Sequence, residues 1–184
     1  MSVAVLGAGA FGTALAIALA RSGTPVTLWS RDARHAADMA EARCNTRRLP
    51  GAALPENVSV SAEIADVTAE ILLLACPTQA LPGLLAKLPG NLRKATLVAC
   101  CKGIDLKSLQ GPTRTIAAAC PDATAAILTG PSFASDIAKG LPTALTLATD
   151  TDPAGRALQT ALGGDTLRLY RTTDTIGAEL GGAL

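Results

Sequence analysis

Short apolar runs alternate with alanine-rich or amphipathic stretches along the whole chain. The apolar runs end at glycine, proline or polar residues, which is typical of strands buried on both faces of a parallel sheet. Strands are predicted at residues 3–6, 25–30, 58–60, 71–75, 96–100, 125–129, 144–148 and 167–170. Helices are predicted at residues 10–21, 33–43, 80–88, 113–120, 132–139, 153–162 and from 174 onward.

This alternation predicts an α/β fold with a doubly wound, mainly parallel sheet covered by helices on both faces. Residues 1–172 are expected to form that domain. Residues 173–184 are expected to begin a helix that leads out of it, because the stretch 176–184 is apolar and does not resemble a fraying end.

Composition narrows the possible functions. Hydrophobic residues make up 49% of the 184 positions and charged residues 17%, so the chain is not of the disordered class. There are 37 alanines but only four aromatic residues, which argues against nucleic-acid binding by base stacking. A formal net charge of +1 provides no bulk attraction to nucleic acid or to a membrane surface.

Neither a membrane span nor a secretion signal is expected. No apolar run approaches the roughly 20 residues of a membrane-spanning helix, and the N-terminus lacks the basic region that opens a signal peptide. The five cysteines form no C-x-x-C pair, so we expect reduced packing thiols and a cytoplasmic protein. They are Cys44, Cys76, Cys100, Cys101 and Cys120. The single histidine, His35, is expected at the surface, and no metal site is predicted.

A glycine-rich motif follows the first predicted strand and opens the first predicted helix. The segment Gly7-Ala8-Gly9-Ala10-Phe11-Gly12 matches G-x-G-x-x-G in the context that a dinucleotide site requires. Gly7 permits the tight turn, Gly9 lets the backbone approach a pyrophosphate, and Gly12 lets the helix pack closely on the strand. The helix N-terminus then offers free N–H groups to the phosphates. A Rossmann-type fold follows; the alternative is a glycine-rich turn without a ligand.

The end of the second predicted strand bears on the choice of cofactor. An NAD site usually carries an acidic residue there, on the ribose 2′-hydroxyl. This chain has Ser30 and Arg31, which suit a 2′-phosphate, while Asp32 is better placed to cap the next helix. NADP(H) is therefore favoured, with NAD(H) as a second possibility. The alternative is that Arg31 is a solvated surface arginine, and Arg47 and Arg48 have the same two interpretations.

Three further segments complete a family pattern. They are Cys101-Lys102-Gly103-Ile104, Thr129-Gly130-Pro131-Ser132-Phe133-Ala134 followed by Gly140-Leu141-Pro142-Thr143-Ala144, and Gly177-Ala178-Glu179-Leu180-Gly181-Gly182-Ala183. Together with the opening turn, and in this order, they resemble the bacterial NAD(P)-dependent sn-glycerol-3-phosphate dehydrogenases over essentially the whole chain.

The resemblance implies an enzyme that reduces dihydroxyacetone phosphate to sn-glycerol 3-phosphate for glycerophospholipid synthesis, usually as a homodimer. It implies that Lys102 contacts both substrate and cofactor, with the ammonium attracting the substrate phosphate or polarising its ketone. The other implied contacts are Gly130 and Ser132 for the substrate, and Ala10, Phe11, Arg31 and Ala134 for the cofactor. The alternatives without a ligand-binding role are that Lys102 is an exposed loop lysine and that Ser132 caps a helix.

The resemblance also implies an all-helical domain after the Rossmann domain, and a proton-transferring lysine just after the G-x-E-L-G-G-A-x stretch. The chain ends at Leu184, where that lysine would be next, so the helical domain is expected to be missing. The chain is therefore expected to bind cofactor with little or no turnover.

Two other functions stay open. One is another two-domain reductase, such as a ketopantoate or 3-hydroxyacyl reductase, which the Lys102 and Gly130 segments disfavour. The other is a non-catalytic, redox-sensing dinucleotide-binding module, in which a residue like Lys102 is not expected.

Overall fold

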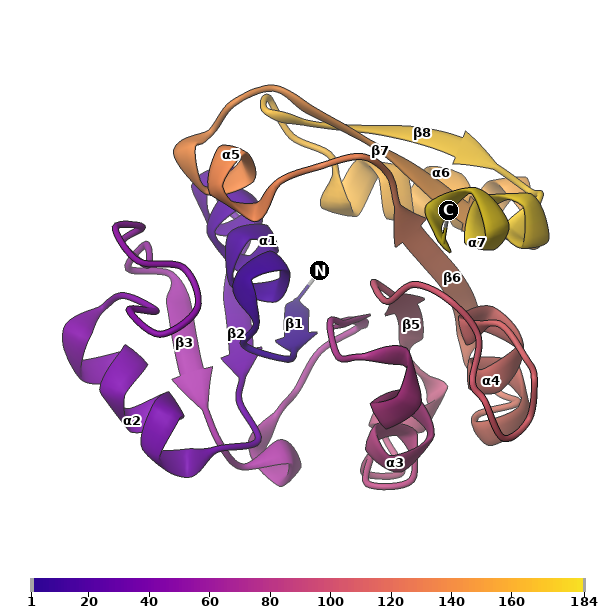
Figure 1. The fold of residues 1–184 in the computed structure, drawn as a ribbon, viewed down its shortest axis with the longest axis horizontal. Coiled ribbons are helices and arrows are strands. Elements are labelled where there is room, and N and C mark those ends of the chain that lie inside the picture. Colours follow the sequence, from indigo (N-terminus) through magenta and orange to yellow (C-terminus); the bar gives the residue numbers. More distant parts are fainter. Residues whose placement is uncertain (1, 184) are drawn as a thin grey trace.

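Strands and helices alternate along residues 2–183, the part of the chain that the computed structural model describes (Figure 1). The strands are β1 (Val3–Leu6), β2 (Val26–Trp29), β3 (Val58–Ser61), β4 (Ile71–Leu74), β5 (Thr96–Ala99), β6 (Thr124–Thr129), β7 (Thr143–Thr149) and β8 (Leu167–Thr172). The helices are α1 (Ala10–Arg21), α2 (Ala33–Ala42), α3 (Leu81–Leu85), α4 (Pro112–Ala119), α5 (Ala134–Lys139), α6 (Asp152–Leu162) and α7 (Thr175–Ala183). Short 3₁₀ turns lie at Ile64–Asp66, Thr78–Ala80 and Leu92–Lys94.

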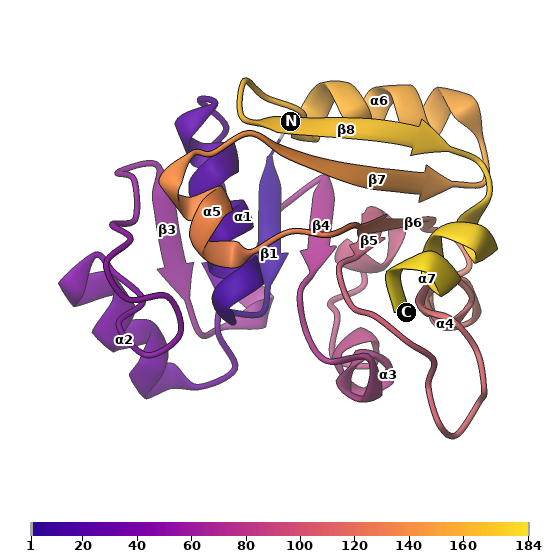
Figure 2. The ribbon, with the colours of Figure 1, turned by 45° about the horizontal axis from the view of Figure 1, so that its top comes forward.

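All eight strands join one sheet in the order β3-β2-β1-β4-β5-β6-β7-β8. Neighbouring strands are parallel except β6 and β7, where Leu128 faces Leu147 in an antiparallel register. Strand β7 therefore starts at the edge of the sheet where β6 ends, and β8 returns parallel to β7 through α6 (Figure 2). The prediction of a doubly wound, mainly parallel sheet is confirmed.

Successive side chains of each strand point to opposite faces and build two apolar layers. Val5 and Leu73 pack on one face beneath α1, α5 and α6, whereas Leu6 and Leu74 pack on the other face with α3 and α4. Because both faces are covered, β1 and β4 are buried at every position. The alanine-rich helix α1 is buried continuously from Gly12 to Ala20, so small side chains permit its close approach to the sheet.

Two helices differ from their predicted bounds by two residues or more, whereas the others agree to within one residue. The stretch predicted as a helix at 80–88 forms the turn Thr78–Ala80 and only the five-residue α3, which contains Pro82 and Gly83. Both of these residue types disfavour a longer helix. The helix predicted at 132–139 begins at Ala134.

The strand order reverses direction around β1 and β4, which lie side by side. In open α/β sheets, ligands bind outside the carboxyl ends of the strands at such a switch point. Gly7 follows β1 and Ala75 follows β4, so the glycine-rich turn occupies this place. None of the helices within residues 2–183 is both long and apolar enough to cross a membrane.

Candidate functional site

The three motif glycines have different surroundings. A Cβ atom at Gly7, where φ is +130°, would lie 2.3 Å from the Ala75 carbonyl oxygen, and one at Gly12 would lie 2.1 Å from the Gly7 carbonyl oxygen. A Cβ atom at Gly9 would meet no other atom within 4 Å. Gly7 and Gly12 thus permit the close approach of turn, helix and β4, whereas Gly9 leaves an open cradle beside the backbone. A dinucleotide pyrophosphate fits that cradle.

The N-terminus of α1 faces the same cradle. Gly9 is the N-cap, no side chain caps the helix, and its first turn contains no acidic residue. The N–H groups of the first turn of a helix lack acceptors within it and carry partial positive charge. Ala10 and Phe11, at the first two helical positions, are half-buried. This arrangement suits an anionic ligand at Ala10 and Phe11.

The residues after β2 divide into structural and exposed groups. Ser30 is 4% exposed, and its hydroxyl donates to the Asp32 carbonyl oxygen at 3.3 Å. Asp32 accepts the His35 backbone N–H at 3.1 Å and pairs with Arg47 at 3.2 Å, so the predicted helix cap is confirmed. The bond from the His35 backbone holds the pKa of the Asp32 carboxyl below its usual value. Arg31 is exposed beside them.

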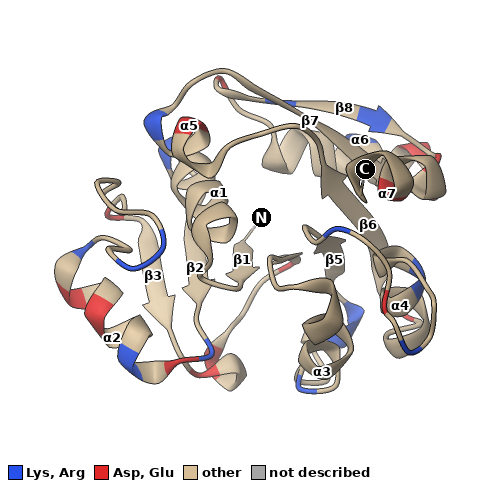
Figure 3. Ribbon diagram, in the orientation of Figure 1, with Lys and Arg blue, Asp and Glu red and all other residues tan. Residues whose placement is uncertain are grey.

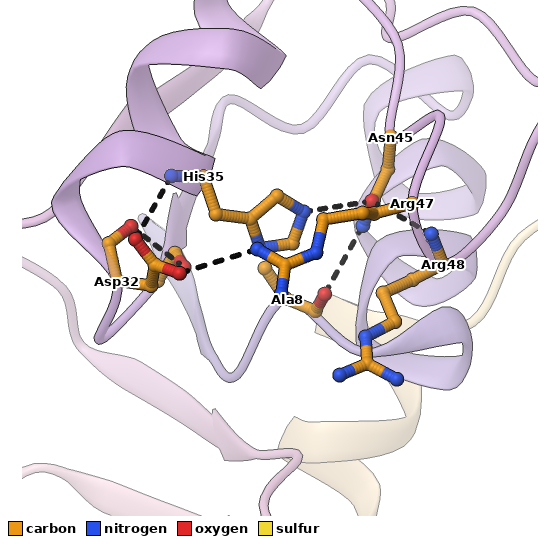
Figure 4. A network of polar contacts seen from close by, with 7 residues as sticks. Ala8, Asp32, His35, Asn45, Arg47 and Arg48 are labelled. Carbon is orange, nitrogen blue, oxygen red and sulfur yellow. Dashed lines mark hydrogen bonds and ion pairs between the residues drawn. The ribbon is translucent and has the colours of Figure 1, made fainter.

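A buried polar network, which the sequence did not reveal, joins the loop after α2 to the glycine-rich turn (Figure 4). Asn45 is 0% exposed, and its Nδ2 donates to the Ala8 carbonyl oxygen at 3.0 Å and to Thr13 Oγ1 at 2.7 Å. Its Oδ1 lies 2.9 Å from His35 Nε2. The expectation that His35 lies at the surface is wrong, because this contact holds the ring with only 7% of the residue exposed.

The loop that carries Lys102 is fastened to the segment after β4. The Thr78 hydroxyl donates to the Lys102 carbonyl oxygen at 2.5 Å. Gln79 Nε2 donates to the Ile104 carbonyl oxygen at 2.8 Å, and the Leu106 N–H donates to Gln79 Oε1 at 3.1 Å. These three bonds place Lys102 just beyond the carboxyl end of β5, as the sequence predicted. Within residues 2–183 no salt bridge involves Lys102, and its side chain is exposed.

A cavity of about 630 Å³ lies between the ends of β6 and β8, the middle of β7 and helix α7. Lys102 and Gly130 both line it, so the structure brings these two predicted residues together. Ser132 and Ala134 do not line it. Phe133, and not Ser132, is the N-cap of α5, and no side chain caps that helix, so capping by Ser132 is ruled out.

Helix α7 forms one wall of the cavity and is held by a carboxylate from its own sequence. Glu179 Oε1 accepts the Thr113 N–H and the Thr113 hydroxyl, both at 2.7 Å, and so satisfies the N-terminus of α4. On the cavity side, Gly182 packs against Thr129, whose Oγ1 is buried without a partner in residues 2–183. Helix α7 is therefore held to α4 through Glu179 and packs against β6 at Gly182.

The cysteines near the site are poor nucleophiles. Burial raises the pKa of the Cys76 thiol to about 12, and it also raises the pKa values of Cys100 and Cys101. With pKa values raised in this way, the thiols stay protonated at neutral pH. They react poorly because the thiolate is the reactive form. This supports their interpretation as packing residues. In the described part of the chain, no group of three or more histidine, cysteine or acidic residues is arranged to hold a metal ion.

Basic residues lie on two segments near the carboxyl edge of the sheet, the loop between α2 and β3 and the loop after β5 (Figure 3). The first loop carries Arg47 and Arg48, and the second carries Lys102. Arg47 is paired with Asp32, whereas Arg48 and Lys102 have no ion pair within residues 2–183 and leave positive charge where an anionic ligand would enter.

Comparison with known proteins gives a consistent result. Residues 2–154 match a family model described as the N-terminus of NAD-dependent glycerol-3-phosphate dehydrogenase. Proteins named glycerol-3-phosphate dehydrogenase (NAD(P)+) are 60% identical in Ruegeria sp. (strain TM1040) and 58% identical in Paracoccus denitrificans (strain Pd 1222). The matches cover 100% of this chain but only 58% and 57% of those relatives, so it spans little more than half of their length.

Solved structures agree. A glycerol-3-phosphate dehydrogenase from Coxiella burnetii is 30% identical and superposes with a TM-score of 0.90 over 98% of this chain and 56% of that chain. A glycerol-3-phosphate dehydrogenase from Plasmodium falciparum, 21% identical, has a TM-score of 0.88 over 100% of this chain and 56% of that chain, and shows the same fold.

Proposed function

The chain belongs to the NAD-dependent glycerol-3-phosphate dehydrogenase family, and from this premise we propose that it is the cofactor-binding part of an enzyme that reduces dihydroxyacetone phosphate to sn-glycerol 3-phosphate. The single observation that carries the proposal is the cavity that brings Lys102 and Gly130 together at the carboxyl edge of the sheet that holds the glycine-rich turn. In the cell, the product would enter glycerophospholipid synthesis.

In this proposal Lys102 acts on the substrate through its charge. Its ammonium, which has no carboxylate partner within residues 2–183, attracts the substrate phosphate or polarises the ketone oxygen. Gly130 and Ser132 contact the substrate from the β6–α5 segment, with Ala134 toward the cofactor. When bound, the reduced nicotinamide supplies a hydride to the ketone carbon.

NADP(H) is the proposed cofactor, with NAD(H) as the alternative. The carboxylate of Asp32 already accepts the His35 N–H as the cap of α2 and pairs with Arg47, so the acidic residue after β2 has a structural role at the start of α2. Arg31 is exposed beside it and suits a 2′-phosphate. The Ser30 hydroxyl would add a contact to that phosphate only by leaving the Asp32 carbonyl oxygen, to which it donates in the structure. The glycine-rich turn, with Gly7, Gly9 and Gly12, would hold the pyrophosphate.

We also propose that two domains of the full enzyme have separate functions. Residues 1–172 form the dinucleotide-binding domain, and 173–184 begin the helix that leads to a helical domain, which would supply the proton-transferring lysine. The greater length of the relatives and the exposed Ile176 and Leu180 on α7 support this division. A polypeptide of residues 1–184 would then bind cofactor and turn over little. The whole enzyme would be a cytoplasmic homodimer.

The test is a titration of the 184-residue chain with NADPH and NADH, followed through the fluorescence of Trp29, its sole tryptophan. We expect tighter binding of NADPH. Arg31→Ala should raise the Kd for NADPH about fivefold and leave that for NADH unchanged, because only NADPH carries the 2′-phosphate.

Binding of neither cofactor would refute the proposed function. Tighter binding of NADH would refute the assignment of Arg31. Oxidation of NADPH that depends on dihydroxyacetone phosphate and scales with the amount of the 184-residue chain would refute its proposed inactivity.

A further inference from the structure

Asn45 uses all four hydrogen-bonding positions of its side-chain amide in a site closed to solvent. Nδ2 donates to the Ala8 carbonyl oxygen and to Thr13 Oγ1, while Oδ1 accepts the Arg48 backbone N–H at 3.1 Å and meets His35 Nε2. Such an amide has two donors and two acceptor positions, so none is left over. A fully satisfied buried network of this kind is rigid.

The partners determine the orientation of the amide and the tautomer of the ring. The Ala8 carbonyl accepts only and the Arg48 N–H donates only, so Nδ2 must face Ala8 and Oδ1 must face Arg48. Oδ1 is an acceptor, and His35 Nε2 therefore carries a proton and donates to it. Helix α2 is thereby tied to the same amide.

The network connects two segments that flank the open cradle at Gly9. Ala8 lies in the glycine-rich turn and Thr13 lies near the start of α1, which together make the proposed phosphate site. On the other side, the Leu49 N–H donates to the Asn45 carbonyl oxygen at 2.8 Å, which closes the loop around Arg48. The backbone of Arg48 is thus held at a fixed place relative to the turn.

Arg47 and Arg48 use their charges differently. Arg47 pairs with Asp32, whereas the Arg48 guanidinium has no ion pair and no side-chain hydrogen bond to any residue in 2–183. Figure 4 shows the Arg48 side chain turned away from the Asp32–Arg47 pair. Its charge is exposed and available to an anion.

We propose that Asn45 is a positioning residue of the phosphate site and that Arg48, held through it, contacts the pyrophosphate of the dinucleotide. The pyrophosphate is favoured over the 2′-phosphate because Asn45 links Arg48 to Ala8 in the turn, whereas Arg31 follows β2, on the ribose side. The inference rests on the proposed function, since it presupposes a dinucleotide at the turn.

The first experiment compares Arg48→Ala with Arg34→Ala in the 184-residue chain, with NADPH and NADH as ligands. Arg34 is a matched control, an exposed arginine on α2 without an ion pair in the described chain. Arg48→Ala should raise the Kd of both cofactors by the same factor, roughly fivefold, because both carry the pyrophosphate. Arg34→Ala should change neither. Unchanged affinities in Arg48→Ala, or a loss limited to NADPH, would overturn the assignment of Arg48.

The second experiment tests Asn45 without removing it from the core. Thr13→Val keeps the shape of the side chain but removes the acceptor of Asn45 Nδ2, whereas Thr13→Ser keeps the hydroxyl. We expect Thr13→Val to raise both Kd values about fivefold and Thr13→Ser to restore binding close to the original, with the same circular dichroism in all three proteins. A lower melting temperature with unchanged Kd values in Thr13→Val would show a merely structural role and overturn the proposal.

Cofactor binding by the unmodified chain distinguishes a failure of the proposed function from a failure of the roles assigned to Arg48 and Asn45. If the unmodified chain binds neither cofactor, the proposed function and this inference both fail. If it binds cofactor and the Arg48 and Thr13 variants bind equally well, only this inference fails.

Discussion

Gly9 and Gly12 stand three positions apart in one motif, yet their surroundings make opposite demands on a side chain. At Gly12 the Gly7 carbonyl oxygen and the Ala75 side chain occupy the space that a Cβ would need. At Gly9 that space is open and the backbone φ is an ordinary −75°, so folding does not require glycine there. Gly12 therefore serves the fold, whereas Gly9 serves the ligand.

Substitution should separate these two roles. Gly12→Ala is expected to destabilise the chain by about 1–3 kcal/mol, because the turn or α1 must move to admit the methyl group. Gly9→Ala is expected to leave the melting temperature nearly unchanged and to weaken NADPH binding, because its methyl group points into the cradle. Thermal unfolding and NADPH titration of both variants measure the difference. Equal loss of stability in the two variants would contradict this account.

At the scale of elements, α7 is docked by one carboxylate that reaches the N-terminus of α4. A helix leaves its first N–H groups without intrahelical acceptors, and here Glu179 satisfies one of them at Thr113. Gly111 makes room for this carboxylate, since a Cβ there would lie 2.0 Å from Glu179 Oε2. The cavity wall thus depends on a contact between two helices distant in sequence.

Removal of that carboxylate should loosen α7 selectively. In Glu179→Ala, amide hydrogen exchange within 175–183 is expected to accelerate roughly tenfold, as both bonds to Thr113 are lost. Glu179→Gln keeps an oxygen that can accept the Thr113 N–H, so its exchange should stay closer to that of the original chain. Exchange in β1 and α1 serves as the internal control. Equal protection of α7 in Glu179→Ala and in the unmodified chain would refute the docking role.

On the scale of the whole molecule, the two apolar layers and the shared sheet couple the ligand site to global stability. The glycine-rich turn joins β1, in the middle of the sheet, to α1, which is buried against it. A ligand that binds only the folded turn therefore stabilises the entire chain by mass action.

NADPH should accordingly raise the melting temperature of the 184-residue chain. At 100 times the Kd the gain is about 2.7 kcal/mol, which corresponds to roughly 5–10 °C for a domain of this size. A scan of melting temperature against NADPH concentration measures it, with Gly9→Ala as the variant in which the shift should shrink. A melting temperature that does not change with NADPH concentration would contradict a dinucleotide site in the folded chain.

The sequence by itself determined the features that depend on neighbours along the chain. The alternation of apolar runs and helices, the glycine-rich turn and the Asp32 cap all follow from contacts within a few residues, where steric and hydrogen-bonding rules act directly. Lys102 was placed at the sheet edge for the same reason, since it comes straight after a buried strand. The ordered motifs supplied the family, which residues 2–154 confirm.

Only the tertiary structure decided the features that join distant segments. Asn45 reaches Ala8 across 37 positions, and Glu179 reaches Thr113 across 66. The same is true of the burial of His35 and the antiparallel direction of β7. The physical reason is that a polar side chain in a loop has the same local pattern whether it is solvated or buried. Its role is set by the groups that folding brings against it.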